Sequence, residues 1–215
     1  MEKQFIMLEA LISNKFILLS FTFSYLLGSI PFGYILFKHF KSKDIRSYGS
    51  GNIGATNVNR LLGKKVGAIT LFLDFIKVVI PTYVANLYLG SDYGAFCGVF
   101  SILGHIFPIW LKFKGGKGVA GFIGFLLIIS WPLCILFLLV WLFSVKIFKY
   151  SALGAILSIL LNMVFFKASL FFQFNYNLLN FIPGEPAELN LTIFISLIIL
   201  IKHVKNIKGL INKKL

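Results

Sequence analysis

The chain has 215 residues, of which 58% are hydrophobic and only 13% are charged. A soluble domain of this length carries roughly twice that charged fraction, so the composition excludes an ordinary soluble protein and indicates an integral membrane protein. The net charge of +14 does not indicate nucleic-acid binding, because Lys and Arg gather in the cytoplasmic loops of membrane proteins. Cys97 and Cys134 lie in apolar runs without neighbouring metal ligands, which favours packing over a disulfide or a metal site.

Apolar runs separated by polar breaks predict membrane-spanning helices along most of the chain. About 20 residues cross a bilayer, so the stretch 119–148 is either one kinked helix or two short ones. Ser130-Trp131-Pro132 in its middle favours a break, because helices tend to end before a proline. The predicted spans are 16–37, 66–88, 94–111, 119–130, 133–148, 151–174 and 187–202.

The positions of the basic residues decide between six spans and seven. With seven spans and an exterior N-terminus, the interior loops hold 17 Lys and Arg, whereas the exterior segments hold only Lys3 and Lys15. Six spans would place Lys146 and Lys149 outside, against the positive-inside rule. We therefore predict an all-α integral membrane protein of about seven transmembrane helices, with the N-terminus outside and the C-terminus in the cytosol. Residues 1–215 form a single domain in this interpretation.

Two further features refine this topology. Phe5, Leu8 and Ile12 share one helical face, which predicts an interfacial helix within residues 1–15. Gly121 and Gly124 lie in a short span and predict either close helix packing or a partly re-entrant segment.

The first basic loop has the composition of an anion-binding loop. Residues 44–60 read DIRSYGSGNIGATNVNR. The glycines allow the backbone to bring several N–H groups to one point, and Ser, Thr and Asn add side-chain donors. Such a loop at the start of a helix binds anions, and the alternative is a polar turn with capping residues. The candidate ligands are Arg46, Gly49, Ser50, Gly51, Asn52, Gly54, Thr56, Asn57 and Arg60.

Two more segments combine donors with basic residues. In GHIFPIWLKFKGGKG, residues 104–118, Lys117 follows Gly115 and Gly116, so the backbone can approach an anion that the ammonium neutralises. The spacing of a Walker A loop is absent, which argues against ATP hydrolysis, and a flexible basic turn is the alternative. His105 fits a structural or a catalytic role equally well. The third segment, His203 to Lys208, contains His203 and Asn206 and follows the last span.

The predicted topology brings these three segments to one membrane face. That arrangement favours a site for a phosphorylated substrate, with apolar helices behind it that can hold an acyl chain. Asp74 and Lys77 share one face of the second span and are either functional or a mutually neutralising pair. His39 and Asp44 have the H-x-x-x-x-D spacing of soluble-headed acyltransferases, but a single pair without further motifs is weak evidence.

The motifs resemble those of the bacterial acyl-phosphate:glycerol-3-phosphate acyltransferase family. GSIPFGY, DIRSYGSGNIGATNVNR, LDFIK and GHIFPIWLKFKGGKGVA occur in that family's order and spacing. The resemblance implies a seven-helix enzyme of the bacterial plasma membrane with a cytosolic active site. It implies transfer of an acyl group from acyl-phosphate to the sn-1 hydroxyl of glycerol 3-phosphate, the first step of phospholipid synthesis, which gives lysophosphatidate and phosphate.

The resemblance also implies the functional residues. They are Ser50 and Arg60 of the first motif, Lys117 of the second, and His203 and Asn206 of the third. The third motif departs from the family pattern at Val204, Lys205, Gly209, Lys213 and Leu215, and Val78 stands where the family usually has glycine after Lys77.

The expected partners are the two substrates and membrane lipids, with no nucleic acid, no cofactor and no metal. Carboxylates and histidines are too scattered along the sequence to form a metal-ligand set. Two other functions stay open: a transporter for a phosphorylated metabolite, and an inactive scaffold of the same fold. The transporter is disfavoured because the basic glycine loops lie on one face and no inverted repeat is visible. The sequence does not determine the oligomeric state.

Overall fold

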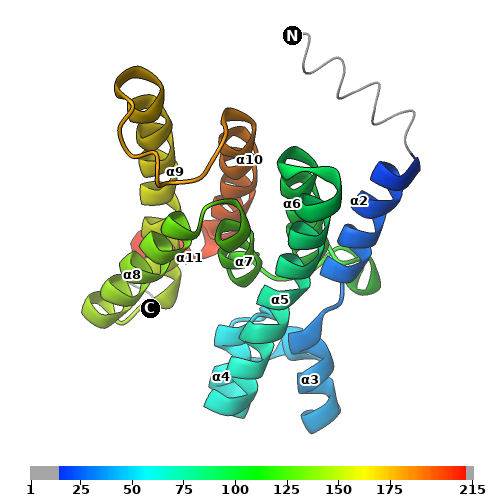
Figure 1. Ribbon diagram of the computed structural model, residues 1–215. Coiled ribbons are helices and arrows are strands. Elements are labelled where there is room, and N and C mark those ends of the chain that lie inside the picture. Colours follow the sequence, from blue (N-terminus) through cyan, green and yellow to red (C-terminus); the bar gives the residue numbers. More distant parts are fainter. Residues whose placement is uncertain (1–14, 212–215) are drawn as a thin grey trace.

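The computed structural model describes residues 15–211, and every regular element in that range is a helix. Labels follow Figure 1. The α-helices are α2 (Lys15–Gly28), α3 (Phe32–Lys41), α4 (Ala55–Leu62), α5 (Lys64–Leu89), α6 (Ser91–Ile106), α7 (Val119–Ile129), α8 (Trp131–Phe148), α9 (Ser151–Tyr176), α10 (Pro186–Lys202) and α11 (Val204–Ile211). Two 3-10 helices, η1 (Ile45–Ser47) and η2 (Ile109–Leu111), lie in the connections. The predicted interfacial helix falls almost entirely outside the described residues.

The long helices form two packed groups with a middle layer between them. Helices α2, α5 and α6 pack together, and α8 and α9 form an antiparallel pair on the other side (Figure 1). Helix α7 contacts α5 and α8, and α10 contacts α6 and α9, so these two helices join the groups. Their shared core contains Ile102, Phe122, Phe125, Phe137 and Ile199, all fully buried.

Five segments of the described chain are long and apolar enough to cross a membrane. They are Lys15–Lys41, Lys64–Leu89, Ser91–Leu111, Trp131–Phe148 and Ser151–Tyr176. Helix α7, with 11 residues, and α10, with 17, occupy the other two predicted spans but are shorter. Each predicted span therefore corresponds to helical structure, whereas the count of seven crossings and the orientation of the termini stay predictions.

The predicted span 16–37 lies within one candidate membrane span, Lys15–Lys41, which consists of two helices. The chain leaves helical geometry after Gly28 and resumes at Phe32, and Pro31 is the N-cap of α3. Proline lacks an N–H and disfavours helical geometry in the residue before it, which explains the break at Ile30-Pro31. The carbonyl of Ile30 accepts a 2.8 Å hydrogen bond from Lys77 Nζ, because a buried backbone acceptor needs a partner inside a membrane.

The break predicted at Ser130 is confirmed. Ser130 has extended backbone angles and separates α7 from α8, with Pro132 in the first turn of α8. Close packing at the two glycines of α7 is also confirmed. A Cβ on Gly121 would lie 2.8 Å from Val78 Cγ2, and one on Gly124 would lie 2.8 Å from the Phe75 carbonyl oxygen. Small residues thus allow α7 to approach α5 closely.

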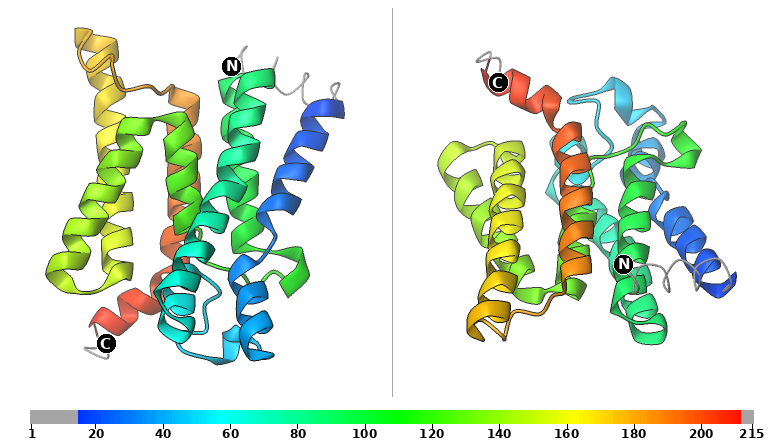
Figure 2. Two further views of the ribbon diagram at one scale, coloured as in Figure 1. Left: turned by 60° about the horizontal axis from the view of Figure 1, so that its bottom comes forward. Right: turned by 90° about the horizontal axis from the view of Figure 1, so that it is seen from above.

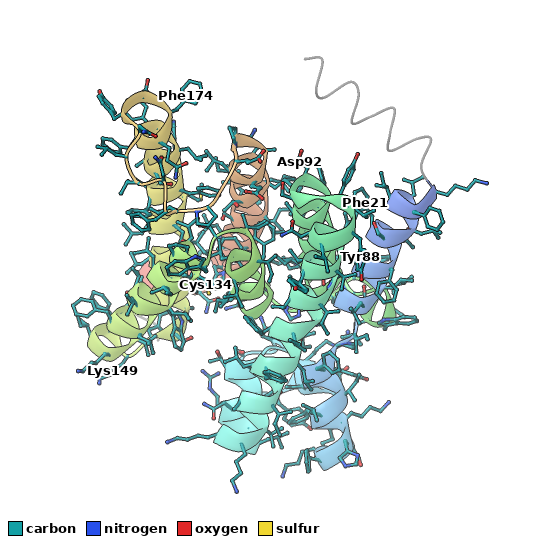
Figure 3. The ribbon with its side chains drawn as sticks, viewed as in Figure 1. Phe21, Tyr88, Asp92, Cys134, Lys149 and Phe174 are labelled. Atoms are coloured by element: carbon teal, nitrogen blue, oxygen red, sulfur yellow. The ribbon has the colours of Figure 1, made fainter. Side chains whose placement is uncertain are left out.

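The helix ends that carry the candidate segments lie at one end of the bundle. Figure 2 shows α4, α11 and the lower half of α3 at the same end, together with the turn between α8 and α9. Figure 3 shows Lys149 of that turn at the opposite end from Asp92 and Phe174. A small second core of Phe37, Ile45, Ile53, Val58 and Leu111 anchors the first basic loop there.

Candidate active site

The first basic loop is organised by the side chain of Asn57, which is 2% exposed. Asn57 Oδ1 accepts a hydrogen bond from the Ser50 N–H at 2.9 Å, and Asn57 Nδ2 donates to the carbonyls of Tyr48 and Asn52 at 3.1 and 2.8 Å. Gly49 has φ of +59°, and a Cβ there would collide with Asn57 Oδ1. One buried amide therefore fixes both sides of the loop, and Gly49 is required by geometry and by space.

The loop leads directly into α4. Gly54 is the N-cap of the helix, and its N–H donates to Asn52 Oδ1 at 2.8 Å. Ser50, Thr56 and Arg60 are all exposed, Ser50 at the loop and the other two on α4. Because the first N–H groups of a helix have no acceptor within the helix, this end of α4 suits an anion.

The two arginines of the first motif have different surroundings. Arg46 makes an ion pair with Asp44, with Nη2 2.7 Å from Oδ2, and its Nη1 donates to the Leu111 carbonyl at 3.4 Å. The Arg46 guanidinium lowers the pKa of Asp44. Arg46 thus ties the loop to η2, while Arg60 is exposed on α4. Asp44 also caps η1, which gives it a structural role apart from any pairing with His39.

The second glycine segment folds back onto the end of α6. The N–H groups of Gly115 and Gly116 donate to the carbonyls of Ile106 and His105. A Cβ on Gly116 would collide with the His105 imidazole, so the backbone lies directly against that ring. His105 is 5% exposed, which places it beneath the glycine loop.

His105 also belongs to a buried ionic cluster between α5 and α6. Asp74 Oδ1 lies 2.7 Å from Lys77 Nζ and 3.4 Å from His105 Nδ1. All three side chains are buried. Asp74 and Lys77 neutralise each other, and Lys77 also donates to the Ile30 carbonyl at the break between α2 and α3. The cluster therefore connects this break with His105, on which the second glycine segment lies.

The second and third segments meet through side chains. Lys117 Nζ donates to Asn206 Oδ1 at 2.5 Å, and Asn206 Nδ2 donates to the Tyr150 hydroxyl at 2.7 Å. These residues come from the loop before α7, from α11 and from the turn between α8 and α9. The predicted convergence of Lys117 with Asn206 is therefore observed in the fold. Tyr150 lies outside the sequence motifs, so no sequence pattern indicated its contact with Asn206. Only the fold brings the two residues together.

His203, at the junction of α10 and α11, is 1% exposed. Its Nδ1 lies 2.8 Å from the Ile199 carbonyl oxygen. A carbonyl can only accept, so Nδ1 carries the proton and Nε2 is left as an acceptor. Burial lowers the pKa of His203 to about 4, opposed by the bond to Ile199 and assisted by the charge of Lys117. The imidazole is therefore neutral at pH 7.

Burial also lowers the pKa of Lys117, to about 8. The ammonium is thus mostly charged at pH 7, in a half-buried position where a nearby phosphate is screened less than at the surface. Across residues 15–211, no three His, Cys, Asp or Glu side chains lie close enough together to hold a metal ion.

Two of the departures from the third motif, Val204 and Lys205, differ in burial from the motif residues that are kept. Val204 and Lys205 are exposed, whereas His203 is buried and Asn206 is half-buried. Lys213 and Leu215 lie outside the described residues. The Lys117–Asn206 contact is present beside the altered residues Val204 and Lys205.

Comparison with known proteins agrees with the motifs. The family profile of glycerol-3-phosphate acyltransferase matches residues 18–213. The chain belongs to the glycerol-3-phosphate acyltransferase family. Family members from Bartonella henselae and Pelagibacter ubique are 39% and 44% identical, and the alignments cover 90% and 89% of this chain and 87% and 92% of those relatives.

Solved structures of the family share the fold. The chain is similar to a crystal structure of PlsY, an integral membrane glycerol 3-phosphate acyltransferase, in its glycerol 3-phosphate form, with a TM-score of 0.81, 36% identity and 92% coverage of both chains. The lysophosphatidic acid form of PlsY gives a TM-score of 0.76 and 35% identity, again over 92% of both chains. Family membership, this likeness and the apolar helices make the chain an integral membrane protein.

Proposed function

We propose that this protein transfers a fatty acyl group from acyl-phosphate to the sn-1 hydroxyl of glycerol 3-phosphate, giving lysophosphatidate and inorganic phosphate. The observation that carries the proposal is the contact between Lys117 and Asn206 beside His203, at the same end of the bundle as the first basic loop. We place this end at the cytosolic face of a bacterial plasma membrane, in a seven-span topology with the N-terminus outside. The positive-inside distribution of Lys and Arg supports that orientation.

Acyl-phosphate is a mixed anhydride, so its phosphate is already a good leaving group. In the proposed step, the sn-1 oxygen forms a bond to the acyl carbonyl carbon, and the bond from that carbon to the phosphate oxygen breaks. The phosphate leaves with the electron pair. Such a reaction needs positioning and charge neutralisation more than a nucleophile from the protein.

The roles of the residues follow from their chemistry. We assign Arg60 and Lys117 to neutralising the phosphate groups. The N–H groups of Ser50, Gly51 and Gly54 are bonded within the loop, so we assign the other backbone N–H groups of the Gly49–Gly54 segment and the first turn of α4 to holding the phosphates. Ser50 and Asn206 orient the glycerol 3-phosphate hydroxyl. Direct transfer is preferred over acylation of Ser50, because no histidine lies beside Ser50 in the sequence.

The hydroxyl proton has two candidate acceptors, His203 and a substrate phosphate. A pKa of about 4 makes His203 Nε2 a poor base at neutral pH. The dianion of a phosphate monoester is protonated with a pKa of about 6 and is the better base. We therefore assign the proton of the sn-1 hydroxyl to a substrate phosphate rather than to His203.

The test is release of inorganic phosphate from palmitoyl-phosphate by purified protein in lipid, with and without glycerol 3-phosphate. We expect release that requires glycerol 3-phosphate and yields one lysophosphatidate per phosphate. An Arg60→Ala variant is the matched control and should lose this release. Folded wild-type protein that releases nothing would contradict the proposal, and glycerol 3-phosphate flux into proteoliposomes would then test the transporter.

A further inference from the structure

The turn between α8 and α9 carries a side chain that reaches the candidate active site from a part of the chain with no family motif. Only Lys149 and Tyr150 separate the two helices. Lys149 has a left-handed φ of +56°, and its N–H donates to the Val145 carbonyl at 2.9 Å. Tyr150 is the N-cap of α9, and its carbonyl accepts from the Gly154 N–H at 3.2 Å. The backbone on both sides of Tyr150 is therefore fixed by its helices.

The chemistry of the side chains fixes the direction of each bond in the network. A lysine ammonium has only donors, so the atom of Asn206 that faces Lys117 must be the oxygen. The amide nitrogen of Asn206 then faces Tyr150 and donates to its hydroxyl at 2.7 Å. Lys117 thus selects the orientation of the Asn206 amide, and the Tyr150 hydroxyl, which accepts from the amide nitrogen, holds the amide in that orientation.

Both held groups need such support. Lys117 follows Gly115 and Gly116 and carries its ammonium on a flexible four-carbon stem, which loses rotamer entropy when it is fixed. Asn206 lies on α11, a helix of eight residues near the C-terminus. The helix pair α8 and α9 is one of the two packed groups of the bundle, so a contact from its turn is a firm anchor.

We propose that Tyr150 is a positioning residue for acyl transfer, which holds the Asn206 amide so that Asn206 fixes the Lys117 ammonium beside His203. The inference rests on the proposed function, because it assigns a part in that reaction. Tyr150 does not touch substrate in this account and acts only through Asn206. Its loss therefore misplaces Lys117 and Asn206 without removing either group.

The experiment is a double-mutant cycle of Tyr150→Phe and Asn206→Ala, measured by glycerol 3-phosphate-dependent phosphate release. Phenylalanine keeps the ring and removes the acceptor. We expect Tyr150→Phe alone to lower kcat/KM for glycerol 3-phosphate about tenfold, with the KM for acyl-phosphate changed less than about twofold. In the Asn206→Ala background, adding Tyr150→Phe should cost less than about twofold more.

The matched control is Tyr83→Phe, because Tyr83 lies on the exposed side of α5 and should tolerate loss of its hydroxyl within about twofold. Wild-type activity in Tyr150→Phe would overturn the inference, and so would an equal tenfold loss in both backgrounds, since Tyr150 would then act without Asn206. Wild-type protein that turns over no substrate would instead overturn the proposed function and, with it, the reaction that Tyr150 serves.

Discussion

The candidate active site has two parts that are built in different ways. In the loop of residues 44–60, the organising bonds of Asn57 and Asn52 join residues two to nine positions apart. The cluster of Lys117, Tyr150 and Asn206 joins residues 89 and 56 positions apart. The first part is a local structure that its own sequence specifies, whereas the second exists only when α7, α9 and α11 are packed.

This difference predicts different responses to mutation. A local loop fails when its internal amide or its exposed charge is removed. In the cluster of Lys117, Tyr150 and Asn206, a mutation should lower activity by a smaller factor, because it changes the position or the ionisation of side chains that are still present. The following experiments compare the two parts in order of decreasing expected effect.

The largest effect is expected for Arg60→Ala, measured as kcat/KM for glycerol 3-phosphate. Arg60 is exposed on α4 and, unlike Arg46, forms no ion pair with Asp44 in the described part of the chain, so its loss should lower kcat/KM about 100-fold. Arg46→Ala is the matched control and should cost less than about tenfold, because Arg46 is bound to Asp44 and the Leu111 carbonyl. A loss below tenfold for Arg60→Ala would show that the charge-clamp assignment is wrong.

Asn57→Ala should lower activity about 30-fold and the free energy of unfolding by about 3 kcal/mol. Three hydrogen bonds disappear, each worth about 1 kcal/mol, and the Ser50 N–H is left without its acceptor. Activity and thermal unfolding in detergent measure the two effects. Asn59→Ala, at an exposed position of the same helix, is the control. Equal behaviour of the two variants would contradict the organising role of Asn57.

The cluster of Lys117, Tyr150 and Asn206 predicts how kcat/KM for glycerol 3-phosphate depends on pH. Lys117 has a pKa of about 8, so its ammonium is charged below that pH and neutral above it. We expect kcat/KM for glycerol 3-phosphate to fall as pH rises through about 8 and to be about tenfold lower at pH 9. Lys117→Arg should abolish this fall in kcat/KM at high pH, because a guanidinium stays charged. If kcat/KM of Lys117→Arg falls above about pH 8 as in the wild type, a group other than Lys117 causes the fall.

The smallest effect is expected for Asp44→Asn. Arg46 lowers the pKa of Asp44, so the ion pair stabilises the fold above the pKa of the unfolded carboxyl and is lost as pH falls through the lower folded value. The pair is partly exposed, which limits its contribution at pH 7 to less than about 0.5 kcal/mol. Activity should change less than about twofold, because Asn can still accept the Arg46 N–H. The measurements are thermal unfolding in detergent and kcat/KM for glycerol 3-phosphate. A larger loss in either one would mean that the Asp44–Arg46 ion pair, which ties the loop to η2, is part of the site.

The sequence by itself determined the membrane class, the position of each apolar helix and the break at Ser130. Those features depend on composition, on hydrophobic runs and on proline, all of which act locally. It also marked the first loop, since glycines and amides at short spacing organise their own backbone. Pro31 also ends helical geometry before it, but it lies within a long apolar run, so the sequence predicts a single span there without the break between α2 and α3.

Only the tertiary structure decided which distant side chains meet. It placed Lys77 against the Ile30 carbonyl, His105 beneath Gly116, and Tyr150 against Asn206. The physical reason is that these contacts depend on how helices pack across the bundle, and α7 and α10 join its two groups through small residues and buried apolar faces. No local pattern contains that geometry, so a tyrosine without a motif became part of the site only in the folded chain.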